Sequence, residues 1–164
     1  MKVEEYMPKS IAFEYNDESI GQVININVKD EMYSGKHHCK ILLNTVDLNS
    51  EILTDNKKVL DITYEEFDEI FNKVLCLNFN EMLTKSALIG LDGTLFKLTI
   101  GYAFNYLTFR VYMHDHDIIN RGLENLNTIF NNLLKKLEIN KFLLQNTSVE
   151  YDEEINKLTR GRIL

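Results

Sequence analysis

The sequence contains no tryptophan, one proline and only two cysteines among its 164 residues. Cys39 and Cys76 belong to no CxxC spacing, which argues against both a disulfide framework and a zinc finger. We interpret both as reduced core residues because free cysteine behaves as a small buried hydrophobe. No apolar run approaches the roughly eighteen residues of a membrane span. Residues 1–10 lack the basic and apolar regions of a secretory signal, so we expect a cytoplasmic protein.

Sequence motifs for common enzyme classes are also missing. There is no GxSxG, GxxxxGK[ST], GxGxxG or HExxH motif, which disfavours hydrolases, nucleotide-binding proteins and zinc metalloproteases and predicts no cofactor. The formal net charge of −7 disfavours nonspecific binding to nucleic acid or anionic membranes, because such binding depends on phosphate neutralisation. The charge suits a basic partner better, or it simply keeps the protein soluble without a specific electrostatic role.

The clearest structural pattern lies between Leu88 and Leu137. An Asp92-Gly93 dipeptide between apolar runs predicts a type I′ hairpin, in which Ile89 would face Phe96. A second turn near Gly101–Tyr106 predicts another hairpin, with Ile100 opposite Leu107, Leu98 opposite Phe109 and Phe96 opposite Val111. A helix follows, beginning between Asp115 and Arg121 with Asp117 as a candidate N-cap and Gly122 in its first turn. Its apolar stripe contains Leu123, Leu126, Ile129, Phe130, Leu133, Leu134 and Leu137.

The N-terminal half predicts further strands and one helix. The strands are Ile11–Tyr15, Gln22–Val28 and His38–Val46, with polar connections at Lys29–Lys36 and Asp47–Lys58. Thr63 and Glu66 have the spacing of a capping box, which predicts a helix over Tyr64–Asn78. We therefore expect a single α+β domain over residues 1–164, with five or six antiparallel strands and two main helices on one face. Residues 1–10 form a lead-in and 148–164 a tail.

The second hairpin also carries candidate binding residues. Its register places Lys97 opposite Arg110 on the face away from the core, where two like charges repel. Either the register is different or an acidic group from another strand, the tail or a partner lies between them. The full candidate set is Lys97, Tyr102, Phe104, Tyr106, Arg110 and Tyr112, a composition typical of interfaces. The alternative is a hydrated sheet face beside a loop that is packed by its own aromatic residues.

Two histidine clusters suggest other chemistry. His114 and His116 alternate with Asp115 and Asp117, and together these side chains supply donors suited to zinc, iron or manganese. The alternative is a polar strand-to-helix turn in which Asp115 or Asp117 caps the helix. In the second cluster, His37 is predicted to share the face of Cys39, but a thiolate nucleophile there is a weaker interpretation than a core cysteine.

The run LDGTLFKLTIG, followed by FRVYMHD and RGLENLNTIFNNLLKKL, resembles the DGT-hairpin-helix end of small uncharacterised bacterial proteins, some of which are similar to immunity proteins of toxin systems. Those proteins usually have Trp and a Ser-Pro turn where this chain has Tyr112-Met113 and His114-Asp115. The resemblance covers residues 91–137 and implies a small cytoplasmic α+β protein that acts by binding. It implies no catalytic residues.

These observations favour a non-enzymatic binding protein, such as an immunity-type inhibitor whose partner is a protein, with a basic toxin as one candidate. A metal-dependent enzyme or sensor using His114 and His116 is the alternative. A homodimer through the sheet face that carries Arg110 is a third hypothesis. Neither nucleic acid nor membrane is an expected partner.

Overall fold

The computed structural model describes residues 6–17, 21–47, 55–85, 94–113 and 122–139. The chain groups into two compact units, Met1–Cys76 with Ile89–Met113 and Leu77–Leu88 with His114–Leu164. The first unit contains β1 (Lys9–Asp17), β2 (Gln22–Tyr33), β3 (Lys36–Asp47), β4 (Asp55–Ile62), α1 (Tyr64–Leu75), β5 (Thr94–Tyr102) and β6 (Asn105–Met113). The second contains α2 (Phe79–Lys85) and α3 (Glu124–Lys136). The predicted α+β class is confirmed, whereas the expectation of one domain stays a prediction.

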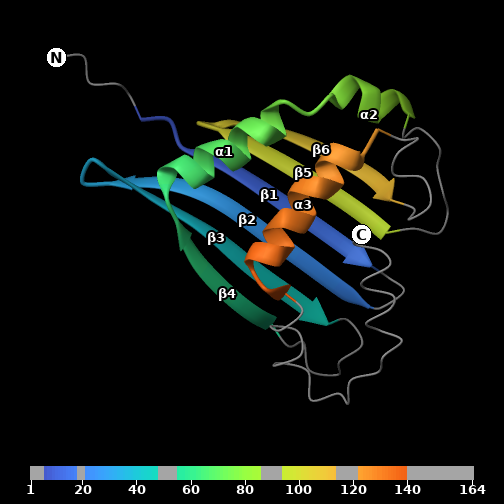
Figure 1. Cartoon of the computed structure of the whole chain (residues 1–164), viewed down its shortest axis with the longest axis horizontal. Coiled ribbons are helices and arrows are strands. Elements are labelled where there is room, and N and C mark those ends of the chain that lie inside the picture. Colours follow the sequence, from blue (N-terminus) through green and yellow to red (C-terminus); the bar gives the residue numbers. More distant parts are fainter. Residues whose placement is uncertain (1–5, 18–20, 48–54, 86–93, 114–121, 140–164) are drawn as a thin grey trace. The chain divides into compact units, whose positions relative to one another are not determined.

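The six strands form one antiparallel sheet in the order β4-β3-β2-β1-β5-β6 (Figure 1). Alternation along each strand separates a core face, whose side chains are buried, from an outer face, whose side chains are partly exposed. The predicted alternation of β2 is confirmed, since Ile24, Ile26 and Val28 are buried and the residues between them are not. The core face contains Ile11, Phe13, Ile24, Ile26, Val28, Ile41, Leu43, Phe96, Leu98, Phe109 and Val111.

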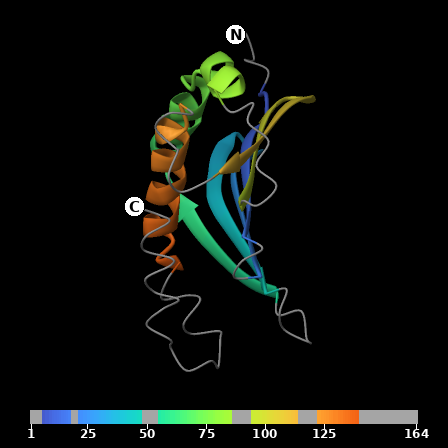
Figure 2. The ribbon, with the colours of Figure 1, turned by 90° about the vertical axis from the view of Figure 1, so that its right-hand side faces the viewer.

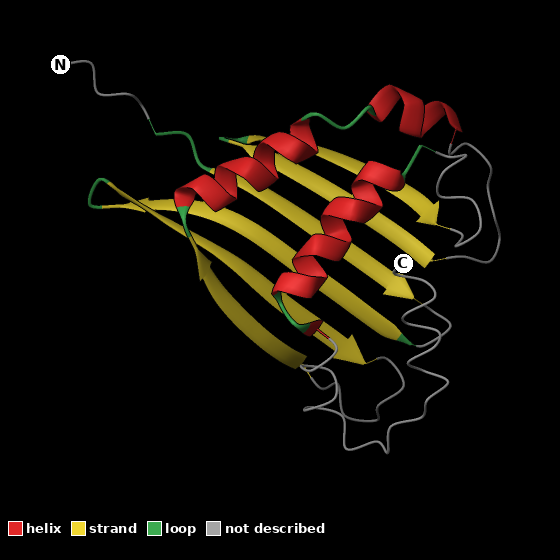
Figure 3. Cartoon of the chain, in the orientation of Figure 1, coloured by secondary structure: helices red, strands yellow, loops and turns green. Residues whose placement is uncertain are grey.

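The connection predicted over Lys29–Lys36 is instead the end of a long hairpin. Strand β2 continues to Tyr33 and β3 begins at Lys36, so only Ser34 and Gly35 form the turn (Figure 3). Both turn residues have positive φ, 52° at Ser34 and 74° at Gly35, as a type I′ turn requires. The polar residues of this segment suggested a loop, but they pair across the hairpin, where the strand ladder satisfies their backbone groups.

The sheet differs from the prediction at two further strands. Residues 55–58, predicted as loop, begin β4, which pairs with β3 over its whole length although its sequence DNKKVLDI has a weak apolar pattern. On β5, Phe96 pairs with Tyr15 of β1 on one side and with Val111 of β6 on the other. The predicted pairing of Ile89 with Phe96 is therefore wrong. The Asp92-Gly93 turn itself lies outside the described residues.

Helix α1 lies against the core face of the sheet, over β2 and β3 (Figure 2). The predicted capping box is confirmed: the Glu66 N–H donates to Thr63 Oγ1 at 3.2 Å, and the Thr63 N–H donates to Glu66 Oε2 at 2.9 Å. The helix buries Phe67, Phe71 and Val74 and ends at Leu75, earlier than predicted. These buried positions recur at three- and four-residue spacing, which fixes the side of α1 that faces the sheet.

In the second unit, α3 begins at Glu124, later than predicted. Leu123 occupies the N-cap position without a side-chain hydrogen bond, and Gly122 precedes the helix with φ of 67°. The candidate cap Asp117 lies outside the described residues. A Cβ at Gly122 would lie 3.1 Å from Glu81 Cγ of α2, so glycine suits both the backbone angle and this approach. The predicted stripe is confirmed as buried, together with Ile139; the short α2 was not predicted.

Candidate functional site

The hairpin that joins β5 and β6 is tighter than the sequence suggested. The predicted register is confirmed, with Ile100 opposite Leu107 and Leu98 opposite Phe109, and pairing continues to the very end of both strands. Only Ala103 and Phe104 remain unpaired at the turn. Ala103 has φ of 54°, in the left-handed region, and its N–H donates to the Pro8 carbonyl at 2.8 Å.

Large apolar side chains are exposed on every side of this turn. Phe104 is 94% exposed, Tyr106 71%, Leu107 54% and Tyr102 49%. Together with the exposed Arg110 we call these residues the hairpin surface. Scattered exposed hydrophobic residues are normal, but several aromatic and aliphatic side chains exposed around one turn are typical of interaction sites.

Gly101 allows the Tyr106 ring to lie close to the outer face of the sheet. A Cβ built at Gly101 would lie 2.5 Å from Ser10 Oγ and 2.9 Å from Tyr106 Cε1. Those distances are too short for any real side-chain carbon, so the ring and the Ser10 hydroxyl occupy the space that a larger residue would need. The position of Tyr106 on the hairpin surface therefore depends on this glycine.

The predicted pairing of Lys97 with Arg110 is confirmed, and a neighbouring strand supplies an acidic group for one of them. Glu14 of β1 lies opposite Lys97, and its Oε2 is 3.2 Å from Lys97 Nζ. Arg110 is exposed and has no ion-pair partner among the described residues. Residues 94–113 contain these two cations and no acidic residue. Among the residues that the structure describes, an acidic group therefore complements Lys97 but none complements Arg110.

The candidate residues divide between the two faces. Lys97, Tyr106 and Arg110 share the outer face. The register assigns position 112 to the same face, but the side chain of Tyr112 lies outside the described residues. Tyr102 is part of β5, on the same side as Ile100, and Phe104 is in the turn. We predicted that Tyr102, Phe104 and Tyr106 lie in one loop beside the outer face. That prediction is wrong, because the pairing of β5 with β6 extends to Tyr102 and Asn105 and the aromatic residues surround the end of the hairpin.

No family model and no curated protein matches this sequence. The site is consequently interpreted from its own residues.

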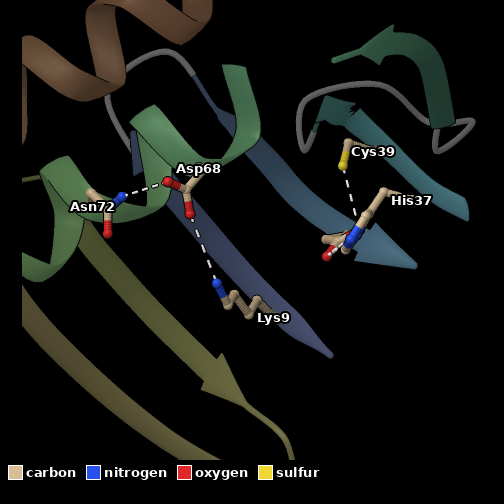
Figure 4. A network of polar contacts seen from close by, with 6 residues as sticks. Lys9, His37, Cys39, Asp68 and Asn72 are labelled. Atoms are coloured by element: carbon tan, nitrogen blue, oxygen red, sulfur yellow. Dashed lines mark hydrogen bonds and ion pairs between the residues drawn. The ribbon is translucent and has the colours of Figure 1, made fainter. Parts of the chain in front are cut away.

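A second polar site, centred on Asp30, lies at the far end of β2. The Asp30 side chain is only 1% exposed, yet His37 Nδ1 lies 2.9 and 3.0 Å from its two carboxylate oxygens (Figure 4). The Cys39 thiol donates to Asp30 Oδ1 at 3.4 Å, and the Tyr6 hydroxyl donates to the Asp30 carbonyl at 2.6 Å. The His37 ring also packs on Tyr64 of α1, with centroids 4.1 Å apart. These contacts confirm that His37 and Cys39 share a face.

The surroundings of Asp30 raise the pKa of two neighbouring groups, the Cys39 thiol and the Tyr6 hydroxyl. Burial, followed by the hydrogen bond to Asp30 and its negative charge, raises the pKa of the Cys39 thiol to about 12. Burial and the same carboxylate raise the pKa of Tyr6 to about 12. A thiol with so high a pKa is almost wholly protonated at neutral pH and is a poor nucleophile. This supports the interpretation of Cys39 as a core residue, which is confirmed as free and buried.

The interpretation of Cys76 as a core residue is wrong. Cys76 is exposed because it is the C-cap of α1, beyond the last buried position of the helix.

On the same helix, Asp68 lies 3.8 Å from Lys9 Nζ and accepts a hydrogen bond from Asn72 (Figure 4). Lys9 was predicted to be part of a lead-in; it is the first residue of β1 and links that strand to α1.

The candidate metal ligands His114 and His116 lie outside the described residues. Within the described ranges, no group of three or more His, Cys, Asp or Glu side chains is placed to hold a metal ion. Among the helices that the structure describes, none combines the length and apolar character needed to span a bilayer.

The exposure of Leu107 and the polar contacts of Asp30 were not predicted from the sequence. Leu107 alternates with Phe109 and Val111, which are buried, so only its place near the end of the sheet distinguishes it. Asp30 lies two residues after Val28, so the alternation of Ile26 and Val28 along the strand already assigns it to the core face. This alternation was the available signal. The signal was overlooked because a lone carboxylate on a core face is unusual without partners, and those partners come from β3 and residue 6.

Proposed function

We propose that this chain is a non-enzymatic binding protein that recognises a protein partner through the hairpin surface. The observation that carries the proposal is the exposure of Phe104, which is 94% accessible at the tip of the hairpin. Burying one such side chain at an interface contributes on the order of 1.5 to 3 kcal/mol. Exposed Tyr106 and Arg110 belong to residue types that are enriched among the strongest contributors to protein interfaces.

Two further observations point to an immunity-type inhibitor. The segment over residues 91–137 resembles small uncharacterised bacterial proteins, some of which are similar to immunity proteins. The formal net charge of −7 favours association with a partner that is basic overall, such as a toxin that acts on nucleic acid, because long-range attraction accelerates encounter. Such a complex would be tight, stoichiometric and weakened by salt.

The first experiment is to identify what co-purifies with the tagged chain from its native cell, with mass spectrometry and metal analysis on the same sample. A single protein at a one-to-one ratio supports the proposal. A sample without any macromolecular partner contradicts it, and bound metal in that sample would favour the alternative site at His114 and His116.

The second experiment locates the contact on the captured partner. Phe104→Ser should weaken binding by roughly thirtyfold, the loss expected when an interface anchor worth about 2 kcal/mol is removed. Leu75→Ser is the matched control, because Leu75 is another exposed apolar residue, 52% accessible, on α1. Equal effects of the two substitutions would place the contact away from the hairpin surface.

A further inference from the structure

Strand β6 is an edge strand with a regular backbone. In the described part of the sheet, β6 pairs only with β5, and the register between them runs without a bulge from Thr94 opposite Met113 to Tyr102 opposite Asn105. Alternate residues of an antiparallel strand direct their N–H and C=O groups away from the neighbour. Every second residue of the nine in β6 therefore directs its backbone groups outward, where another extended segment can form a ladder.

The two edges of the sheet differ in how they are protected. The opposite edge strand, β4, contains Lys57, Lys58 and Asp61 within its eight residues. Charged side chains of this kind discourage pairing with other chains. Strand β6 contains Arg110 as its sole charged residue and no proline or glycine. Charged residues thus discourage strand pairing at β4, whereas the sequence of β6 is suited to strand pairing.

The charges around Arg110 indicate what kind of segment fits. Glu14 neutralises Lys97 from the β1 side, at 3.2 Å, whereas Arg110 on the far side of Lys97 faces outward. Residues directly opposite one another on neighbouring strands have Cβ atoms about 5 Å apart, which suits a carboxylate opposite a guanidinium. A strand added beside β6 would place one of its own side chains there.

We propose that β6 binds an extended segment of the protein partner by strand addition, and that this segment places a carboxylate opposite Arg110. This inference rests on the proposed function and specifies the mode of contact. Apolar residues of the added strand, alternating with the acidic one, would continue the core face beside Leu107, which is 54% exposed. A partner that is basic overall can still contain one segment with a carboxylate, so this inference agrees with the proposed function.

A second copy of this chain fits the edge less well. Antiparallel pairing of β6 with itself about Phe109 would place Thr108 opposite Arg110, so the two Arg110 side chains would become diagonal neighbours on one face. Each Arg110 also lies beside Lys97. Four cations would then gather, with the two copies of Glu14 as the only acidic partners that the described residues provide, whereas an acidic segment neutralises the cluster.

The test uses two synthetic peptides as long as β6, TVTVEVTVT and TVTVKVTVT, with capped ends, added to the full-length protein. Amide hydrogen exchange followed by NMR reports which strand gains a neighbour. The glutamate peptide should protect amides of β6 and bind about tenfold tighter than the lysine peptide at low salt. Arg110→Gln should abolish this preference and Arg110→Glu should reverse it. Lys57→Glu on β4 is the matched control and should leave it unchanged.

Three outcomes would overturn strand addition at β6: equal binding of the two peptides, protection of amides outside β6, or protection that rises with protein concentration in the absence of peptide. The last outcome would identify a second copy as the occupant. A captured partner whose binding leaves β6 amides unprotected refutes this inference while the proposed function stands. Peptide binding with the expected preference, in a chain that captures no partner, supports the inference while the proposed function fails.

Discussion

The reactivity of the two cysteines provides a quantitative test of the site around Asp30. Cys39 is 5% exposed and its thiol pKa is raised to about 12, first by burial and then by the carboxylate. At pH 8 such a thiol is about 10⁻⁴ ionised, whereas an unperturbed thiol with a pKa of about 8.5 is roughly one-quarter ionised. Because the thiolate is the reactive species, Cys39 should react with iodoacetamide at least about a thousandfold more slowly than a free cysteine in solution, and far more slowly than the exposed Cys76.

The assay is alkylation at pH 8, with the modified residue located by peptide mass spectrometry. Asp30→Asn should accelerate labelling of Cys39, because the charge that opposes ionisation is lost, but only partly, because burial is the larger cause. Thr63→Ala is the control for labelling through transient unfolding, since it removes the cap of α1 without touching Asp30. Native Cys39 that reacts within tenfold of Cys76, or an Asp30→Asn variant no faster than Thr63→Ala, would refute this account.

Three further predictions concern stability, each measured by urea denaturation. Thr63→Ala should lower the free energy of unfolding by about 1 kcal/mol, because the α1 capping box is lost; an unchanged value would contradict the cap. Gly101→Ala should lower it by about 1 to 3 kcal/mol, because the new Cβ would meet Tyr106 at 2.9 Å; a neutral effect would show that the ring moves freely. The hydrogen bond from Lys40 lowers the pKa of Glu31 in the folded state, so this pair stabilises the fold above the unfolded pKa of Glu31 and the effect is lost as pH falls through the folded pKa. Glu31→Gln should therefore lose less stability than the parent chain between pH 7 and pH 3, and identical losses would contradict the pairing.

Local patterns predicted the fold best where one period dominated. The stripe of α3, the capping box at Thr63 and the register that places Lys97 opposite Arg110 all depend on neighbours within one hairpin or helix. These features are short in range, so the sequence contains the information directly. The strand β4 and the far half of β2 were missed because their polar residues become strand residues only when β3 supplies the ladder.

Long-range pairing was the main source of error at the candidate sites. The Asp92-Gly93 turn suggested that a preceding strand would cover β5, whereas β1 from the start of the chain occupies that position. The same pairing brings Glu14 to Lys97, which no local pattern indicates. An acidic group from another strand was one alternative for this pair, but Glu14 lies on the β1 side of Lys97 and not between Lys97 and Arg110.

The end of the β5–β6 hairpin combines features that stability does not favour. Ala103 adopts a left-handed backbone angle that costs about 1 kcal/mol relative to glycine. Phe104 exposes almost its whole side chain beside it, and β6 carries a single charge where an isolated edge is safer with several. Folding alone would be served equally or better by glycine, a polar residue and added lysines at these places. A surface that buries Phe104 and pairs β6 on binding gives all of these features one physical explanation, which is why we propose this end of the hairpin as the binding site.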